Sequence, residues 1–75
     1  MEELYAVLED LRPDVDFHAE KKLIDNGILD SFDILTLVSN LSDEFDLEIK
    51  PADLVAQNFN SAEGLWEMIQ RLQED

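Results

Sequence analysis

Apolar side chains recur at helical spacing in three segments of the chain, and the first lies near its N-terminus. There the spacing i, i+3, i+4, i+7 is met by Leu4, Val7, Leu8 and Leu11. This spacing gathers side chains on one face of a helix, so we predict a helix over residues 2–12. Pro13 disfavours helical geometry at the residue before it and marks the end of this helix.

The longest periodic segment predicts a second helix over Ser31–Phe45. Asp30 is a good N-cap for this helix, because its carboxylate can accept hydrogen bonds from N–H groups that the first turn leaves unpaired. The face expected to enter the core collects Ile34, Leu37, Val38, Leu41 and Phe45. A stripe of this width is sufficient to dock the helix on a core.

The opposite face of the same segment is mostly polar but contains Phe32 and Leu35. Its polar members are Thr36, Ser39 and Asp43. Single exposed apolar residues are common on protein surfaces. The alternative is a recognition face, in which the two apolar side chains anchor a partner and the acids Asp33, Asp43 and Glu44 surround them. The pattern leaves both interpretations open.

The third periodic segment follows Ser61, which we expect to act as the N-cap of a helix. Its apolar stripe consists of Leu65, Met68, Ile69 and Leu72. Trp66 lies off the centre of this stripe, so we expect it to be half-buried. Gly64 weakens the first turn by up to ~1 kcal/mol.

The chain between the second and third segments has only short-range signals. Pro51 and Asp53 begin a short helical piece that we expect to run as far as Val55 or Ala56. Residues 58–60 are predicted to form a loop in which the side chain of Phe59 is buried.

The connection over residues 13–29 follows neither a helical nor an alternating pattern, and it is long for a small domain. Its apolar residues, which can pin it to a core, are Phe17, Leu23, Ile24, Ile28 and Leu29. We expect an ordered crossover with a helical turn near residues 18–23 and a second turn at Asp25-Asn26-Gly27. The predicted fold is an all-α, small four-helix bundle forming a single domain over residues 1–75, with three main helices, one short helix and a long loop between helices 1 and 2.

Composition restricts the classes of partner. The 75 residues include 19 Asp and Glu but only 5 Lys and Arg, which gives a net charge of −14. No Lys or Arg occurs within residues 23–49. Such charge repels nucleic acid and anionic membranes and favours basic protein surfaces. The chain has no membrane-length apolar run and begins with acidic residues, so we expect a soluble, cytoplasmic protein. We also expect it to be a monomer.

Candidate catalytic and metal-binding groups are few. The chain has no cysteine, two glycines and one histidine, His18, which lies in the long connection without an apparent orienting partner. A nucleophile–histidine pair and a glycine-rich phosphate loop are therefore not expected. The same connection lacks the ligand spacing and the glutamate of a calcium-binding loop. We expect neither an enzyme nor a metal site.

Ser31 is the residue on which a functional hypothesis depends. As the first residue of the second helix, its hydroxyl would point outward at the positive end of the helix dipole. A phosphate attached there would meet unpaired N–H groups, so this position suits a phosphodiester. Asp30-Ser31 is equally an ordinary way to begin a helix, and capping alone remains the alternative.

Taken together, these segments resemble the acyl carrier protein superfamily over essentially the whole chain. The matching residues are Leu29-Asp30-Ser31-Phe32-Asp33, Leu37-Val38, Leu41, Glu44-Phe45, Ile49, Pro51, Asn58-Phe59 and Ser61. The resemblance implies that a phosphopantetheinyl transferase attaches phosphopantetheine from coenzyme A to Ser31. The thiol of this arm would then hold an acyl or aminoacyl group as a thioester.

The resemblance also implies roles for neighbouring residues. Asp30, Phe32 and Asp33 would flank the attachment site. The helix face read by partner enzymes would consist of Phe32, Leu35, Ser39, Asp43 and Glu44. A space between the helices that shelters an acyl chain would be lined by Ile34, Leu41 and Phe59. The expected partners are the transferase, a cargo-loading ligase or acyltransferase, and downstream enzymes with basic surfaces.

Some positions depart from the patterns of related carriers. Phe32 stands where leucine is commoner, and Thr36 and Ser39 replace the acid and the methionine typical of fatty-acid carriers, which counts against a generic fatty acid role. The motif Asp30-Ser31-Phe32 resembles the corresponding motif of D-alanyl carrier proteins, although those proteins usually have glycine at the position of Asp33. Leu29 and Phe32 count mildly against a peptidyl carrier. The competing hypothesis is an unmodified acidic helical adaptor that binds a basic protein surface through its second helix.

The charge imbalance predicts a salt-dependent stability. Repulsion among the carboxylates should weaken as ionic strength rises, so the melting temperature should increase from low to moderate salt. Circular dichroism melting over a sodium chloride series measures this. A melting temperature that stays flat over the series would contradict the prediction.

Overall fold

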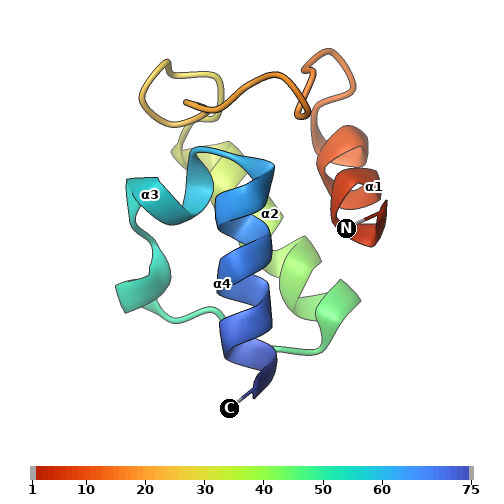
Figure 1. Ribbon diagram of the computed structural model, residues 1–75, viewed down its shortest axis with the longest axis vertical. Helices are drawn as coiled ribbons and strands as arrows, with labels where there is room; N and C mark the ends of the chain where they lie inside the picture. Colours follow the sequence, from red (N-terminus) through yellow and green to blue (C-terminus); the bar gives the residue numbers. More distant parts are fainter. Residues whose placement is uncertain (1, 75) are drawn as a thin grey trace.

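The computed structural model describes residues 2–74 and consists of helices and their connections. The helices are α1 (Glu2–Leu11), α2 (Ser31–Phe45), α3 (Ala56–Phe59) and α4 (Ala62–Glu74), and a 3₁₀ turn spans Pro51–Asp53. No strand occurs within the described residues. The predicted all-α bundle of three main helices and one short helix is therefore confirmed. α1 packs against both α2 and α4, and α3 packs against α4 (Figure 1).

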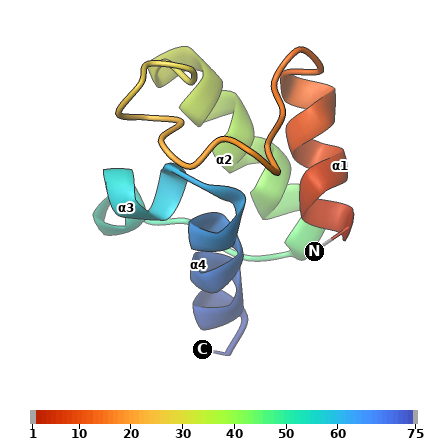
Figure 2. The same cartoon turned by 45° about the horizontal axis from the view of Figure 1, so that its top comes forward.

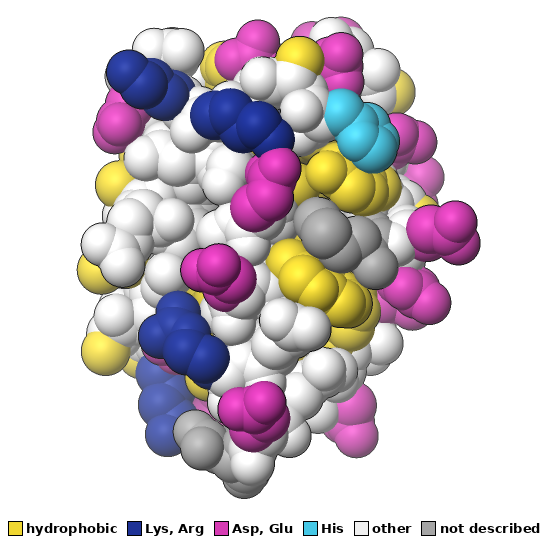
Figure 3. Space-filling model, in the orientation of Figure 1, with side chains coloured by type: hydrophobic (Ala, Val, Ile, Leu, Met, Phe, Trp, Pro, Cys, Tyr) yellow, Lys and Arg dark blue, Asp and Glu magenta, His cyan; other side chains and the backbone are white. Residues whose placement is uncertain are grey.

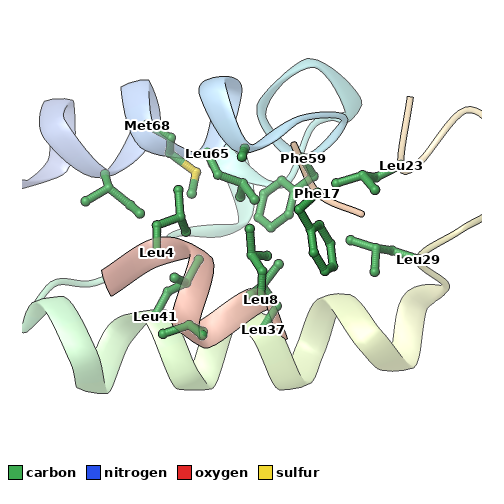
Figure 4. Close-up of a cluster of buried hydrophobic side chains, with 13 residues drawn as sticks. Leu4, Leu8, Phe17, Leu23, Leu29, Leu37, Leu41, Phe59, Leu65 and Met68 are labelled. Atoms are coloured by element: carbon green, nitrogen blue, oxygen red, sulfur yellow. The ribbon is translucent and has the colours of Figure 1, made fainter. Parts of the chain in front are cut away.

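The core forms where the apolar stripes of the three long helices meet (Figure 4). Its fully buried members from the helices include Leu4, Leu8, Leu37, Leu41, Leu65, Met68 and Ile69. The outer positions of the predicted stripes are partly buried against them, namely Leu11, Ile34, Val38, Phe45 and Leu72. Trp66 is half-buried as expected, and its ring meets that of Phe45 edge-on with 6.1 Å between centroids.

The long connection between α1 and α2 crosses one end of the bundle and is anchored there (Figure 2). Phe17, Leu23 and Leu29 are buried in the core, which confirms the prediction of an ordered crossover. In Figure 4, Phe17 lies beside Phe59 in the middle of the cluster. Two segments far apart in the sequence therefore share one apolar centre.

A single asparagine supplies much of the polar anchoring of this connection. The Oδ1 atom of Asn60 accepts hydrogen bonds from the backbone N–H groups of Ile24 (2.9 Å) and Asp25 (3.0 Å). The backbone carbonyl of Asn60 accepts from the N–H of Leu23 at 2.8 Å. Three consecutive N–H groups without helical partners are thus satisfied from the junction of α3 and α4.

The helical turn expected near residues 18–23 lies earlier in the chain. The N–H groups of Ala19 (3.1 Å) and Glu20 (3.0 Å) both donate to the carbonyl of Asp16, and the side chain of Asp16 accepts from the N–H of His18 (3.1 Å). The aspartate side chain starts the turn at residue 16. The turn at residues 25–27 is confirmed, with Gly27 at a positive φ of 70°.

The segment before α4 also differs from the prediction. The helical piece that begins at Pro51 ends at Asp53, and Val55 is extended, with φ −118° and ψ 150°. Helix α3 then includes Asn58 and Phe59, where a loop was predicted. The side chain of Asn58 is buried and donates to the carbonyl of Asp53 at 2.9 Å, which folds the chain back on itself. The predicted burial of Phe59 is confirmed.

Figure 3 shows Asp and Glu side chains scattered over one face of the molecule together with a few Lys and Arg, and ion pairs are few among the described residues. Lys21 in the long connection pairs with Glu63 in the first turn of α4. The hydrogen bond from Lys21 lowers the pKa of the Glu63 carboxyl. His18 is exposed and stacks on the ring of Tyr5 at 3.8 Å between centroids, so the only histidine is tied to an aromatic side chain.

The close approach of α3 to α4 predicts that Gly64→Ala is destabilising. Ser61 caps α4 as expected, accepting from the N–H of Gly64 at 3.0 Å. A Cβ atom at residue 64 would lie 2.7 Å from the carbonyl oxygen of Gln57 and 3.3 Å from that of Asn58. Helix propensity favours alanine by up to ~1 kcal/mol, but overpacking against backbone should outweigh it, for a net loss of about 1 kcal/mol or more.

Urea denaturation of Gly64→Ala measures the loss, and Gln70→Ala is the matched control because residue 70 is exposed on the same helix. The control should remain within about 0.5 kcal/mol of the parent. A Gly64→Ala protein more stable than the parent would show that helix propensity outweighs the contact.

Candidate functional site

Ser31 lies where the long connection turns into α2. It is the first residue of the helix, and its side chain is exposed. Figure 2 shows the first turn of α2 at the end of the bundle that the connection crosses. The buried side chain of Leu29 fixes the chain two residues before the serine. Ser31 therefore combines a rigid backbone position with an accessible hydroxyl.

A reciprocal capping box surrounds this serine. The Oδ1 atom of Asp30 accepts from the N–H of Asp33 at 2.8 Å, and the Oδ2 atom of Asp33 accepts from the N–H of Asp30 at 3.3 Å. The predicted role of Asp30 as N-cap is confirmed. Because the box closes around the first turn, it fixes the backbone on both sides of residue 31.

The capping box leaves two N–H groups of the first turn free for an anion. The first bond within the helix joins the N–H of Ile34 to the carbonyl of Asp30 at 3.0 Å. The N–H groups of Ser31 and Phe32 precede it, and the box uses neither of them. Both lie at the positive end of the helix dipole, where a phosphate is favoured.

Arg12 brings a positive charge to this acidic region from the end of α1. Its Nη1 atom donates to the carbonyl of Ile28 and to Oδ2 of Asp33, both at 3.0 Å. Its Nε and Nη2 atoms donate to the carboxylate of Asp14 at 3.3 and 3.2 Å. The hydrogen bond with Asp14 is the main cause that raises the pKa of Arg12, and the same bond lowers the pKa of Asp14.

The structure places Asp33 differently from the other acids of the expected recognition face. Its side chain is 19% exposed and is bound to both Asp30 and Arg12, so it belongs to the cap. Phe32 and Leu35 are 79% and 65% exposed. The remaining members of the face are exposed as well, namely Ser39, Asp43 and Glu44. These five residues form the exposed α2 face.

A small apolar cavity of about 80 Å³ opens between α2 and α3. It is lined by Ile24, Ile34, Leu54, Val55, Ala56 and Phe59. Ile34 and Phe59 are thus part of a cavity lining, as the resemblance implied. Leu41, the third residue that the resemblance implied, is fully buried in the core and does not line this cavity. Residue 41 lies about two turns along α2 from residue 34.

Comparison with known proteins identifies the family. The model of the family described as "Phosphopantetheine attachment site" matches residues 2–69. The chain belongs to this family. No curated protein and no solved structure matches the chain significantly.

Membership of the phosphopantetheine attachment site family defines the general activity. Its members are carriers without catalysis of their own that bear phosphopantetheine covalently, and they interact with the enzymes that modify them and use them. The chain fits this group, because an exposed hydroxyl adjoins two N–H groups that suit a phosphate. Within residues 2–74, none of the helices has the length and apolarity needed to cross a membrane.

The sequence pattern does not single out two residues that contribute to this carrier fold. It places Arg12 only at the end of the first predicted helix and Asn60 only in a predicted loop. The one indication in the sequence is that residues 23–49 contain many acids and no Lys or Arg, so a cation from elsewhere in the chain could pair with them. Arg12 and Asp33 are 21 residues apart in the sequence, so no local pattern specifies that they pair.

The capping box predicts a measurable role for Asp30 in stability. Asp30→Ala removes the acceptor for the N–H of Asp33 and should lower the free energy of unfolding by about 1 kcal/mol. Asp30→Asn is the matched control, because its side-chain oxygen can still cap. Urea denaturation of both variants tests this. Equal stability of Asp30→Ala and the parent would contradict the capping role.

Proposed function

We propose that Ser31 is the attachment residue for phosphopantetheine and that the chain carries an acyl or aminoacyl group to partner enzymes. Among the four serines of the chain, Ser31 is the one that is both exposed and placed at the start of a long helix. Ser61 caps α4 through its Oγ atom, and Ser39 and Ser42 lie within α2. This position of Ser31 is the observation that carries the proposal.

The arm would supply the chemistry that the chain lacks. The sequence has no cysteine, and a phosphopantetheine thiol would hold the cargo as a thioester. The contribution of the chain is to hold the first turn of α2 in place and to expose the serine. The free N–H groups of residues 31 and 32 would stabilise the phosphodiester.

The exposed α2 face would receive the partner enzymes. Phe32 and Leu35 offer apolar anchors, and Asp43 and Glu44 add negative charge about two to three turns further along the helix. Such a surface suits a partner with basic residues around an apolar patch. The partners would be a phosphopantetheinyl transferase, a cargo-loading ligase or acyltransferase, and downstream enzymes. Association should weaken as salt rises.

The test is intact mass after incubation with coenzyme A and a broad-specificity phosphopantetheinyl transferase. The parent should gain one phosphopantetheine, and Ser31→Ala should gain none. The variant should keep the fold and lose well under ~1 kcal/mol, because the Asp30 cap is retained. Circular dichroism and urea denaturation check this, with Ser42→Ala as a matched control that should be modified like the parent, because Ser42 lies within α2 but outside the exposed α2 face.

Two outcomes would contradict the proposal. Modification of Ser31→Ala to the same extent as the parent would place the arm on another residue. Absence of modification in the parent, with the transferase active on a control carrier, would favour an unmodified acidic adaptor, and capture of a basic protein partner would then be the next step.

A further inference from the structure

Arg12 is the cation that meets the attachment turn, although it lies directly after another helix, α1. The chain has no Lys or Arg between residues 23 and 49, so α2 itself supplies no positive charge. Arg12 reaches across the end of the bundle to the last part of the long connection and to the first turn of α2. Its side chain is 32% exposed, so the pairing lies at the edge of the packed interior.

The contacts of Arg12 join three segments at one nitrogen. Nη1 donates to the carbonyl of Ile28, which lies three residues before Ser31, and to the carboxylate of Asp33, which lies two residues after it. The same Asp33 oxygen accepts from the N–H of Asp30. The backbone on both sides of Ser31 is therefore tied, directly or through Asp33, to the end of α1.

We infer that Arg12 is a positioning residue for modification at Ser31, because it locks the Asp30–Asp33 capping box in place and pairs with the carboxylate of Asp33, two residues after the serine. This inference rests on the proposed assignment of Ser31 as the attachment residue. Arg12 itself contacts neither the serine nor the cofactor in this scheme. A transferase would meet a pre-organised turn, and the phosphodiester would form beside a carboxylate whose charge is already paired.

The structure offers a matched control for this inference. Arg12 has a second carboxylate partner, Asp14, which is 68% exposed and has no contact with α2 through this network. Asp14→Asn and Asp33→Asn each replace one carboxylate partner of the same guanidinium with a neutral amide. Asp14→Asn changes the partner of Nε and Nη2, and Asp33→Asn changes the partner of Nη1. Only Asp33 belongs to the capping box.

The kinetic experiment measures kcat and KM for transfer of phosphopantetheine to the full chain, with a labelled coenzyme A and under conditions where circular dichroism shows every variant folded. Arg12→Gln and Asp33→Asn should each lower kcat/KM about tenfold, mainly through kcat, because the exposed α2 face is unchanged. The double variant should be no slower than the slower single variant, and Asp14→Asn should stay within about twofold of the parent.

A second measurement tests the lock without any transferase. Hydrogen exchange at the amides of Asp33 and Ile34, which donate to the side chain and the carbonyl of Asp30, should become about fivefold faster in Arg12→Gln and stay parental in Asp14→Asn. If Arg12→Gln did not fold, Asp33→Asn would carry both measurements. If the parent were not modified, the proposed function would fail, and the exchange rates would still decide whether Arg12 holds the turn.

Several results would overturn the role of Arg12. Parental kcat/KM in Arg12→Gln would do so, as would single-variant losses that multiply in the double variant. An effect confined to KM would indicate direct contact of Arg12 with the transferase. An equal loss in Asp14→Asn would indicate a general charge effect, and unchanged exchange at Asp33 and Ile34 would show that the turn does not depend on Arg12.

Discussion

The fold depends on how the backbone of residues 12–30 is satisfied without a helix or a strand. Buried N–H and carbonyl groups need partners, and the turns within the connection satisfy some of them but do not attach it to the rest of the bundle. Asn60 resolves much of this problem, because its side-chain and backbone oxygens accept from three consecutive N–H groups of the connection. Phe17 supplies the apolar half of the anchor by packing beside Phe59. The connection is thereby fixed to the α3–α4 junction before it reaches α2.

This anchoring explains why the start of α2 can be well defined although it follows a long connection. Leu29 is buried immediately before the cap, and Arg12 ties the carbonyl of Ile28 to the end of α1. The residues that lead into the first turn of α2 are therefore held both by the core and by the arginine that follows α1. In a protein with net charge −14, the arginine has a second effect, because it removes one negative charge from the place where a phosphate would be added.

The parts of the fold that follow from local pattern were predictable. The three long helices, their buried stripes, the caps at Asp30 and Ser61, and the exposure of Phe32 and Leu35 all follow from helical periodicity and from capping preferences. Helix ends and short elements were less predictable. The turn near residue 18 was misplaced because the side chain of Asp16 begins it earlier, and α3 was missed because a buried asparagine organises it.

The residues of the candidate site also differ in whether local sequence features identify them. Ser31 and Asp30 were identifiable from adjacent residues, since a cap and the first helical residue are local features. The partner of Asp33 cannot be identified from the sequence, because Arg12 lies 21 residues away, directly after α1, and long-range ion pairs produce no periodic pattern. Leu41 was assigned to the cavity lining on resemblance alone. Its complete burial agrees with its place in the α2 stripe, which the periodicity predicts to enter the core.

The exposed α2 face is the feature that packing alone does not explain. Burying a side chain the size of Phe32 or Leu35 stabilises a protein by roughly 1.5–3 kcal/mol, which is a large part of the stability expected for a small domain. Both side chains nevertheless remain in water, one directly after Ser31 and the other one turn further along α2. Within the fold they contribute little, so their apolar area is available to a second protein. Because the capping box and Arg12 fix the same turn, a partner that docks on these two side chains would meet the serine in a defined position.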